Sequence, residues 1–275
     1  MASTADTVLA IIVAMLPFLF FVVFLIGNMY LGKKYTSKRR ALVVEHVEKA
    51  LNPYAKEITT VDLKPEVIEF RCVPNRKQIG VQTLNYTMIN QTFATNVLLN
   101  KLIKGKEKLF IGVKFREAGI DIDPAYRFYF VPYRNKGLIR RNFEVYVQME
   151  DVPTDNPAVD KLYMIKANLP MEIRHFATNE EFLGKAKSLE PYLDLLSIQP
   201  AKESTDPHLQ MTFTLPTDKI NMIPKFLDFF FLVARLHIEN NEAVKKLTSS
   251  KRVKQFSSKT KSAKKRSKKK TKGGK

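Results

Sequence analysis

The pattern of apolar and polar positions begins with one long apolar run near the N-terminus. Val8–Ile26 is nineteen residues without a charge, and further uncharged residues continue the run to Leu31. A helix rises about 1.5 Å per residue, so roughly 20 apolar residues cross the hydrocarbon core of a bilayer. A cleaved signal peptide is the alternative, but Met1–Thr7 has no Lys or Arg and the run exceeds the usual apolar region of about 7–15 residues. We therefore predict a retained anchor over residues 8–31, in which Pro17 kinks the helix or frees the carbonyl of Val13.

Beyond the anchor, the chain shows both helical periodicity and the alternation typical of strands. The helices that we predict run from a cap at Thr36 or Ser37 to Leu51 before Pro53, from a cap at Asn90 or Thr92 to Gly105, and over Asn135–Glu150, Lys161–Ala167, Glu180–Leu196 and Lys225–Leu247. The predicted strands are Val67–Val73, Ile79–Met88, Lys108–Phe115, Tyr126–Val131, Glu172–Phe176 and Leu209–Leu215.

These elements predict an α+β cytosolic domain with a mixed sheet and a long C-terminal helix. Phe226–Ile238 is apolar enough to raise the question of a second membrane span, but Asp228, Arg235 and His237 interrupt it, so a helix buried against the domain is the better interpretation. The expected organisation is a short lumenal segment over residues 1–7, the anchor over 8–31, the domain over 32–247 and a lysine-rich tail over 248–275.

Charge is concentrated at the C-terminal end. The whole chain has a formal net charge of +19, and residues 245–275 hold 15 Lys or Arg and no Asp or Glu. The rest keeps 31 basic and 27 acidic residues, so it is only mildly basic. Like charges repel and little apolar surface offsets the chain entropy, so we predict a disordered tail that binds polyanions. Two targets stay open, anionic lipid at the cytosolic leaflet and RNA phosphate.

Flanking charge also predicts the orientation of the anchor. Lys33, Lys34 and Lys38–Arg40 follow the apolar run, whereas only Asp6 and the terminal amine precede it. The positive-inside rule therefore places the N-terminus in the lumen and the C-terminus in the cytosol. Two sequons, at Asn85 and Asn90, would then remain unglycosylated.

No enzyme motif is present in the sequence. There is no glycine-rich phosphate loop, nucleophile elbow or zinc-protease motif, and a single cysteine, Cys72, cannot form an intramolecular disulfide or a cysteine-based zinc site. The four histidines stand apart, so each is read as a surface or core residue. Asp121 and Asp123 resemble a metal-binding pair of a transferase but equally fit a polar turn. We expect neither enzyme activity nor a cofactor.

Several local stretches resemble the calumin family, the coiled-coil-domain membrane protein of the endoplasmic reticulum found in the PAT complex of the multipass translocon. The stretches that carry the resemblance are Cys72 with the strand after it, the helix Gln91–Ile103, and the segments Glu107–Phe115, Tyr126–Arg141, Ile173–Ala177 and Leu209–Pro216. The similarity is remote and spans about residues 8–250. The family's long acidic lumenal segment has only seven residues as its counterpart here, so calcium buffering is not carried over.

The resemblance implies a non-enzymatic, ribosome-associated membrane factor of the endoplasmic reticulum. It would belong to an intramembrane chaperone with a small membrane partner resembling Asterix, beside a Sec61-type translocon, and would assist nascent multipass membrane proteins. The alternative is a membrane tether or lipid-handling protein whose tail binds anionic lipid.

The resemblance also points to ribosomal RNA as the polyanion that the tail holds. The residues expected to bind RNA phosphate near the exit tunnel are Lys245, Lys246, Lys251, Arg252, Lys254, Lys264, Lys265, Arg266, Lys268, Lys269 and Lys270. Lys38, Arg39 and Arg40 form a second candidate patch, although membrane topology explains them equally well.

Overall fold

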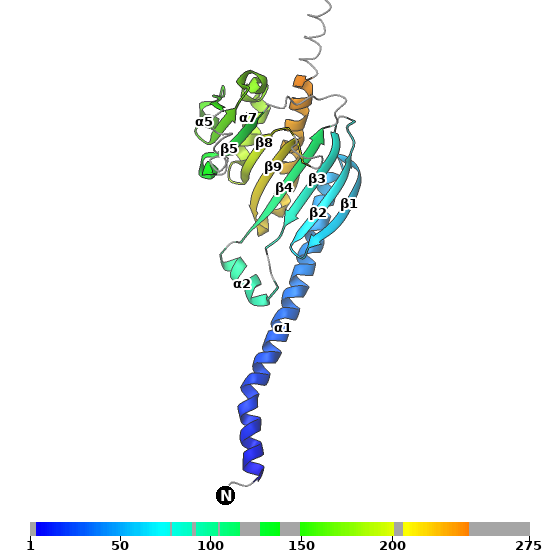
Figure 1. Ribbon diagram of the computed structural model, residues 1–275, viewed down its shortest axis with the longest axis vertical. Coiled ribbons are helices and arrows are strands. Elements are labelled where there is room, and N and C mark those ends of the chain that lie inside the picture. The colour runs from blue at the N-terminus through cyan, green and yellow to red at the C-terminus, as the bar shows by residue number, and fades with distance from the viewer. Residues whose placement is uncertain are drawn as a thin grey trace, which may run out of the picture.

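A single helix joins the apolar N-terminal segment to the domain in the computed structural model (Figure 1), which describes residues 4–77, 79–89, 92–103, 105–115, 127–137, 149–200 and 206–241. Side chains are described within these ranges except at residues 4–11, 81 and 171–172. The tail and the aspartates at positions 121 and 123 lie outside the described residues.

The N-terminal helix, α1 (Thr4–Leu51), has 48 residues and no break between its apolar half and its polar half. The predicted new helix start at Thr36 or Ser37 is therefore wrong. The Thr36 hydroxyl donates to the Gly32 carbonyl one turn back (3.0 Å), so it is used within the helix and caps nothing. The apolar half projects from the domain with exposed side chains, and this helix is long and apolar enough to span a membrane.

The domain contains nine strands and several short helices along the described chain. In chain order the elements after α1 are β1 (Ala55–Lys64), β2 (Val67–Pro74), β3 (Ile79–Thr87), α2 (Ala94–Leu102), β4 (Lys106–Phe115), β5 (Phe128–Pro132), η1 (Tyr133–Asn135), β6 (Glu150–Asp151), α5 (Pro157–Asp160), β7 (Tyr163–Ala167), η2 (Pro170–Ile173), α6 (Arg174–Ala177), α7 (Glu180–Leu189), β8 (Leu193–Ile198), β9 (Leu209–Pro216) and η3 (Thr217–Met222). A C-terminal helix follows over residues 223–241.

The strands form one sheet in the order β1-β2-β3-β4-β9-β8-β5-β7-β6. Every pairing among the described strands is antiparallel, so the expected mixed sheet is wrong. Two residues join β1 to β2, and a connection that short permits only an antiparallel pair. The predicted domain class, strands with helices packed on them, is otherwise confirmed.

Helices cover one face of this sheet. The C-terminal part of α1 and the 223–241 helix lie behind the strands in Figure 1 and contact each other, since Tyr54 just after α1 stacks on Phe231 with ring centroids 3.9 Å apart. On the other side of the C-terminal helix, Phe229 stacks on Phe182 of α7 (5.4 Å). Phe226 stacks on Phe213 of β9 (4.4 Å). The C-terminal helix is thus the centre of the core. This confirms the prediction that it is buried against the domain instead of forming a second membrane span.

Three predicted elements have a different conformation. Lys161–Ala167 was expected to be helical, but Tyr163–Ala167 is strand β7, between β5 and β6. Glu172–Phe176 was expected to be a strand, but it falls in the helical turns η2 and α6. The helix expected over Glu180–Leu196 ends at Leu189, and its last residues form β8. A short apolar run fits either conformation until its neighbours are known.

The other predicted strands are confirmed as β2, β3, β4, β5 and β9, within a few residues at each end. Strand β1 was not predicted. Most of the helix expected over Asn135–Glu150 lies outside the described residues, while Asn135 ends η1 and Glu150 begins β6.

Candidate functional site

The candidate site is the junction at which α1 enters the domain. Arg39 lies one turn before Val43 and two turns before Val47, both fully buried, so it belongs to the stripe that α1 packs on the domain. Glu107 begins the inward face of β4 that Leu109 and Ile111 continue, because alternate residues of a strand share a face. A cation and an anion therefore lie on two apolar faces that meet.

The side chains of Arg39, Glu107 and Tyr86 form a buried hydrogen-bonded cluster. The Arg39 guanidinium donates from Nε to Glu107 Oε1 (3.3 Å) and from Nη2 to Oε2 (2.5 Å). The Tyr86 hydroxyl, from β3, donates to the same Oε2 (2.5 Å). The Glu107 side chain is 0% exposed and that of Arg39 is 10% exposed. The cluster thus joins α1, β3 and β4 through a charge that water does not reach.

Burial and charge act in opposite directions on the titration of Arg39. Burial lowers the pKa of Arg39, but the hydrogen bond and the charge of Glu107 outweigh it and leave the pKa raised. The pKa of Tyr86 is raised by burial and further by the charge of Glu107. Both groups therefore keep their protons at physiological pH, and the cluster holds one ion pair and one neutral phenol.

A second polar contact fixes the residues just after α1 to the C-terminal helix. The Tyr54 hydroxyl donates to Asp228 Oδ1 (2.8 Å), and Lys185 of α7 reaches Asp228 Oδ2 (3.0 Å). Burial, followed by the hydrogen bond to Asp228, raises the pKa of Tyr54 to about 12. Hydrogen bonds from Lys185 and Tyr54 lower the pKa of Asp228. Residues 39–54 are therefore bound to the domain at both ends.

A groove of about 560 Å³ opens beside the buried pair. Its lining includes the basic residues Arg39, Lys101 and Lys219, the ring of Tyr35 and the acid Asp218. The groove lies between α1, α2 and η3 and has excess positive charge.

The predicted RNA-binding patch Lys38–Arg40 is not a patch in the structure. Arg39 forms an ion pair with Glu107. Arg40 pairs with Asp62 of β1 and donates to the Pro65 carbonyl (3.4 Å). Only Lys38 is exposed. The run of basic residues divides between two partners because successive helix positions point in directions about 100° apart, so the hypothesis that all three bind phosphate is wrong.

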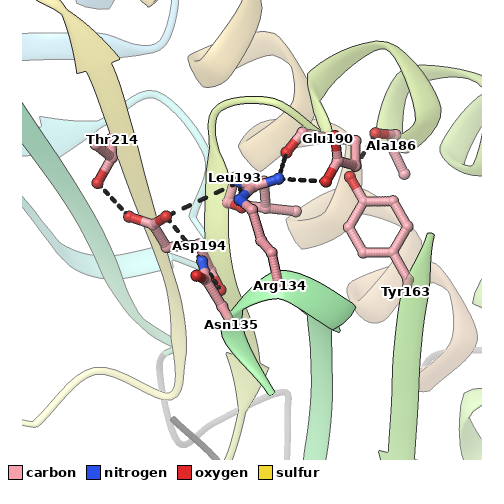
Figure 2. A network of polar contacts seen from close by, with 8 residues as sticks. All are labelled: Arg134, Asn135, Tyr163, Ala186, Glu190, Leu193, Asp194 and Thr214. Carbon is pink, nitrogen blue, oxygen red and sulfur yellow. Dashed lines mark hydrogen bonds and ion pairs between the residues drawn. The ribbon is translucent and has the colours of Figure 1, made fainter. Parts of the chain in front are cut away.

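A further network binds η1 to the strands beside it (Figure 2). Arg134 lies between the carbonyl of Leu193, to which it donates at 2.6 Å, and the carbonyl and carboxylate of Glu190. Asn135 donates to Asp194 Oδ1 (2.9 Å). These contacts use the donors of Arg134 within the fold, so we assign them a structural role.

The fold brings two histidines that are separated in sequence against one aromatic ring, and a third, His175, close enough to act on the charge of His237. Phe115 stacks on His237 (5.3 Å) and on His208 (6.1 Å), and its backbone N–H donates to His208 Nδ1 (3.1 Å). Burial, followed by the neighbouring His175 and His208, lowers the pKa of His237 to about 3. Among the described residues, no three His, Cys, Asp or Glu side chains are placed to hold a metal.

The remaining site residues predicted from sequence, all in 245–270, lie outside the described part of the chain, as do Asp121 and Asp123. Sequence reasoning missed the Arg39–Glu107–Tyr86 cluster. The sequence contained a signal for it, because Glu107 falls at a position that alternation assigns to the inward face of β4. Arg39 likewise falls at a position that helical periodicity assigns to the buried face of α1.

Comparisons with known proteins give no family for this chain. No model of a known protein family matches it, and no curated protein matches it. The similarity to the calumin family therefore stays a resemblance carried by the stretches named above.

Proposed function

We propose that the protein is a non-enzymatic, ribosome-associated factor of the endoplasmic-reticulum membrane, which assists the insertion of multipass membrane proteins as part of an intramembrane chaperone. The observation that carries this proposal is the continuity of α1, whose apolar half passes without a break into a half that is bound to the domain through Arg39 and, just after its end, through Tyr54. Such a helix holds the domain at a constant distance from a membrane. The resemblance supplies the ribosome and the translocon as partners.

The charge of the chain supports a cytosolic polyanion as ligand. The exposed Lys33, Lys34 and Lys38 follow the apolar half of α1, which favours a cytosolic domain. The 15 basic residues of 245–275 then lie on the side where ribosomal RNA is available. Phosphate contacts of this kind release counterions, so the binding has to weaken steeply with salt.

The test is co-sedimentation of the full-length protein, in nanodiscs of neutral lipid, with purified ribosomes over a salt series. Replacing Lys264, Lys265, Arg266 and Lys268–Lys270 by Gln should reduce ribosome binding and flatten its salt dependence. A matched control exchanges Lys for Arg and Arg for Lys at the same positions, which keeps the charge and should keep the binding.

Two results would reject the proposal. The first is unchanged ribosome binding after the Gln substitutions. The second is that the Gln variant loses binding to anionic vesicles, while its binding to neutral vesicles and to ribosomes is unchanged. This second result would favour the membrane tether. Orientation is tested separately: glycosidase-sensitive mass on Asn85 or Asn90 in cells would place the domain in the lumen.

A further inference from the structure

Helix α2 carries an exposed apolar stripe. Leu98, Leu99 and Leu102 are 63%, 55% and 73% exposed, and Ile103, which follows the helix, is 64% exposed. Leu98 and Leu99 each lie one turn from Leu102, so the three leucines share one face, whereas Val97, on the opposite face, is buried. Water is a poor environment for four adjacent aliphatic side chains, so this stripe is expected to have a partner.

The position of α2 is fixed by α1. The Asn28 side chain, on α1, accepts a hydrogen bond from the Thr95 backbone N–H (3.0 Å) and donates to the Thr95 hydroxyl (3.3 Å). Six residues further along α2, Lys101 Nζ lies 5.8 Å from the centroid of the Tyr35 ring of α1. In Figure 1, α2 is at the end of the domain from which α1 projects.

The depth of this contact follows from the length of the helix. Twenty residues of helix from Val8 extend about 30 Å, the thickness of a hydrocarbon core, and end at Gly27, directly before Asn28. Thr95 is bonded to Asn28, so the start of α2 lies where α1 would leave the hydrocarbon. Lys101, on the same helix, lies beside the Tyr35 ring of α1, and Lys106 begins β4 four residues after Leu102, so both long side chains can reach lipid phosphates.

We propose that α2 is a second membrane contact, whose leucine stripe inserts into the boundary between headgroups and acyl chains of the leaflet from which α1 emerges. The proposal rests on membrane anchoring by α1. The occupant of the stripe is lipid, because the only surface that the anchor itself brings to this depth is the bilayer. Two contacts, unlike one, also prevent the domain from rotating about the axis of α1.

The absence of tryptophan from the chain provides a direct test. Single Trp substitutions would be made in the full-length protein at Leu102, at Phe20 in the apolar half of α1, and at Val73, which is exposed at the far end of β2. Each variant is reconstituted into vesicles of phosphatidylcholine and phosphatidylserine, with and without lipids brominated along the acyl chain. The exposed positions tolerate the substitution, and circular dichroism checks the fold.

The proposal expects L102W to emit at shorter wavelength than V73W and to lose most of its emission to brominated lipid. The proposal is overturned, with the anchor left in place, if F20W is quenched but L102W emits at as long a wavelength as V73W and is as little quenched. Blue-shifted but unquenched L102W also overturns it, because a protein surface would then cover the stripe. If F20W itself is unquenched, membrane anchoring and this inference both fail.

Discussion

Replacing Arg39 by Met tests the junction between the anchor and the domain. The substitution keeps an unbranched apolar stem and removes the guanidinium, which leaves the Glu107 carboxylate with the Tyr86 hydroxyl as its remaining hydrogen-bond donor. The Glu107 side chain is fully buried, so water cannot replace the lost partner. Breaking a buried ion pair in this way typically costs about 3–5 kcal/mol.

The stability cost of R39M can be estimated in a second way, because a buried carboxylate without its cation takes up a proton. Protonating a free glutamate costs about 3.7 kcal/mol at pH 7 and about 1 kcal/mol at pH 5, since each pH unit above its ordinary titration point adds about 1.4 kcal/mol. The folded variant then binds one proton more than the unfolded chain, so its stability relative to wild type rises as the pH falls. We therefore expect R39M to lose about 3–4 kcal/mol at pH 7 and clearly less at pH 5.

The assay is urea-induced unfolding of the full-length protein in detergent micelles, followed by circular dichroism at the two pH values. The matched control is R235M, which breaks the exposed Arg235–Glu181 pair (3.1 Å) and should cost at most about 1 kcal/mol. The double variant R39M/E107Q removes the stranded charge and keeps an acceptor for Tyr86, so it should be more stable than R39M. The reasoning is refuted if R39M costs no more than R235M, or if its cost is the same at both pH values.

Three further predictions concern the core of the domain. The pKa of His237 is lowered to about 3, below an ordinary value near 6.5, so the unfolded chain binds more protons and stability falls as the pH drops below 6.5. Between pH 8 and pH 5 this costs about 2 kcal/mol. H237Q should therefore lose less stability than wild type between these pH values in the same urea assay. Burial raises the pKa of the Cys72 thiol to about 12, so maleimide labelling at pH 8 should be far slower in the folded protein than in urea, and equal rates would contradict the buried site. A Cβ added at Gly112 would lie 3.0 Å from Pro207 Cβ, so G112A should lower the melting temperature, with a cost of about 1–3 kcal/mol, whereas G184A, at a position with open space, should not.

Part of the fold follows from local pattern alone. The alternation of Leu209–Leu215 predicted β9, and four alternate residues from Leu109 to Phe115 predicted the inward face of β4. The polar interruptions of Phe226–Ile238 predicted a buried helix, and Phe229 within it is fully buried. Patterns of this kind succeed because the periodicity of each element is set by its own backbone geometry.

Other elements could not be assigned locally. Tyr163–Ala167 is buried on both faces and reads as a short apolar run, which a helix fits as well as a strand. Its conformation is decided by β5, more than twenty residues earlier in the chain, whose backbone groups pair with it. The expected cap at Thr36 failed for a similar reason, because polar residues at the membrane exit do not end a helix that the domain continues to bury.

The sequence by itself determined that this protein has one apolar segment near its N-terminus, a mildly basic domain and a strongly basic C-terminal tail, since these properties are sums over neighbouring residues. Only the tertiary structure decided that Arg39 binds Glu107, 68 positions away, rather than a phosphate. It also decided that α2 lies beside Asn28, at the depth where the anchor would leave a bilayer. Residues so far apart in sequence are brought together when distant segments of the chain pack, and no local pattern contains that information.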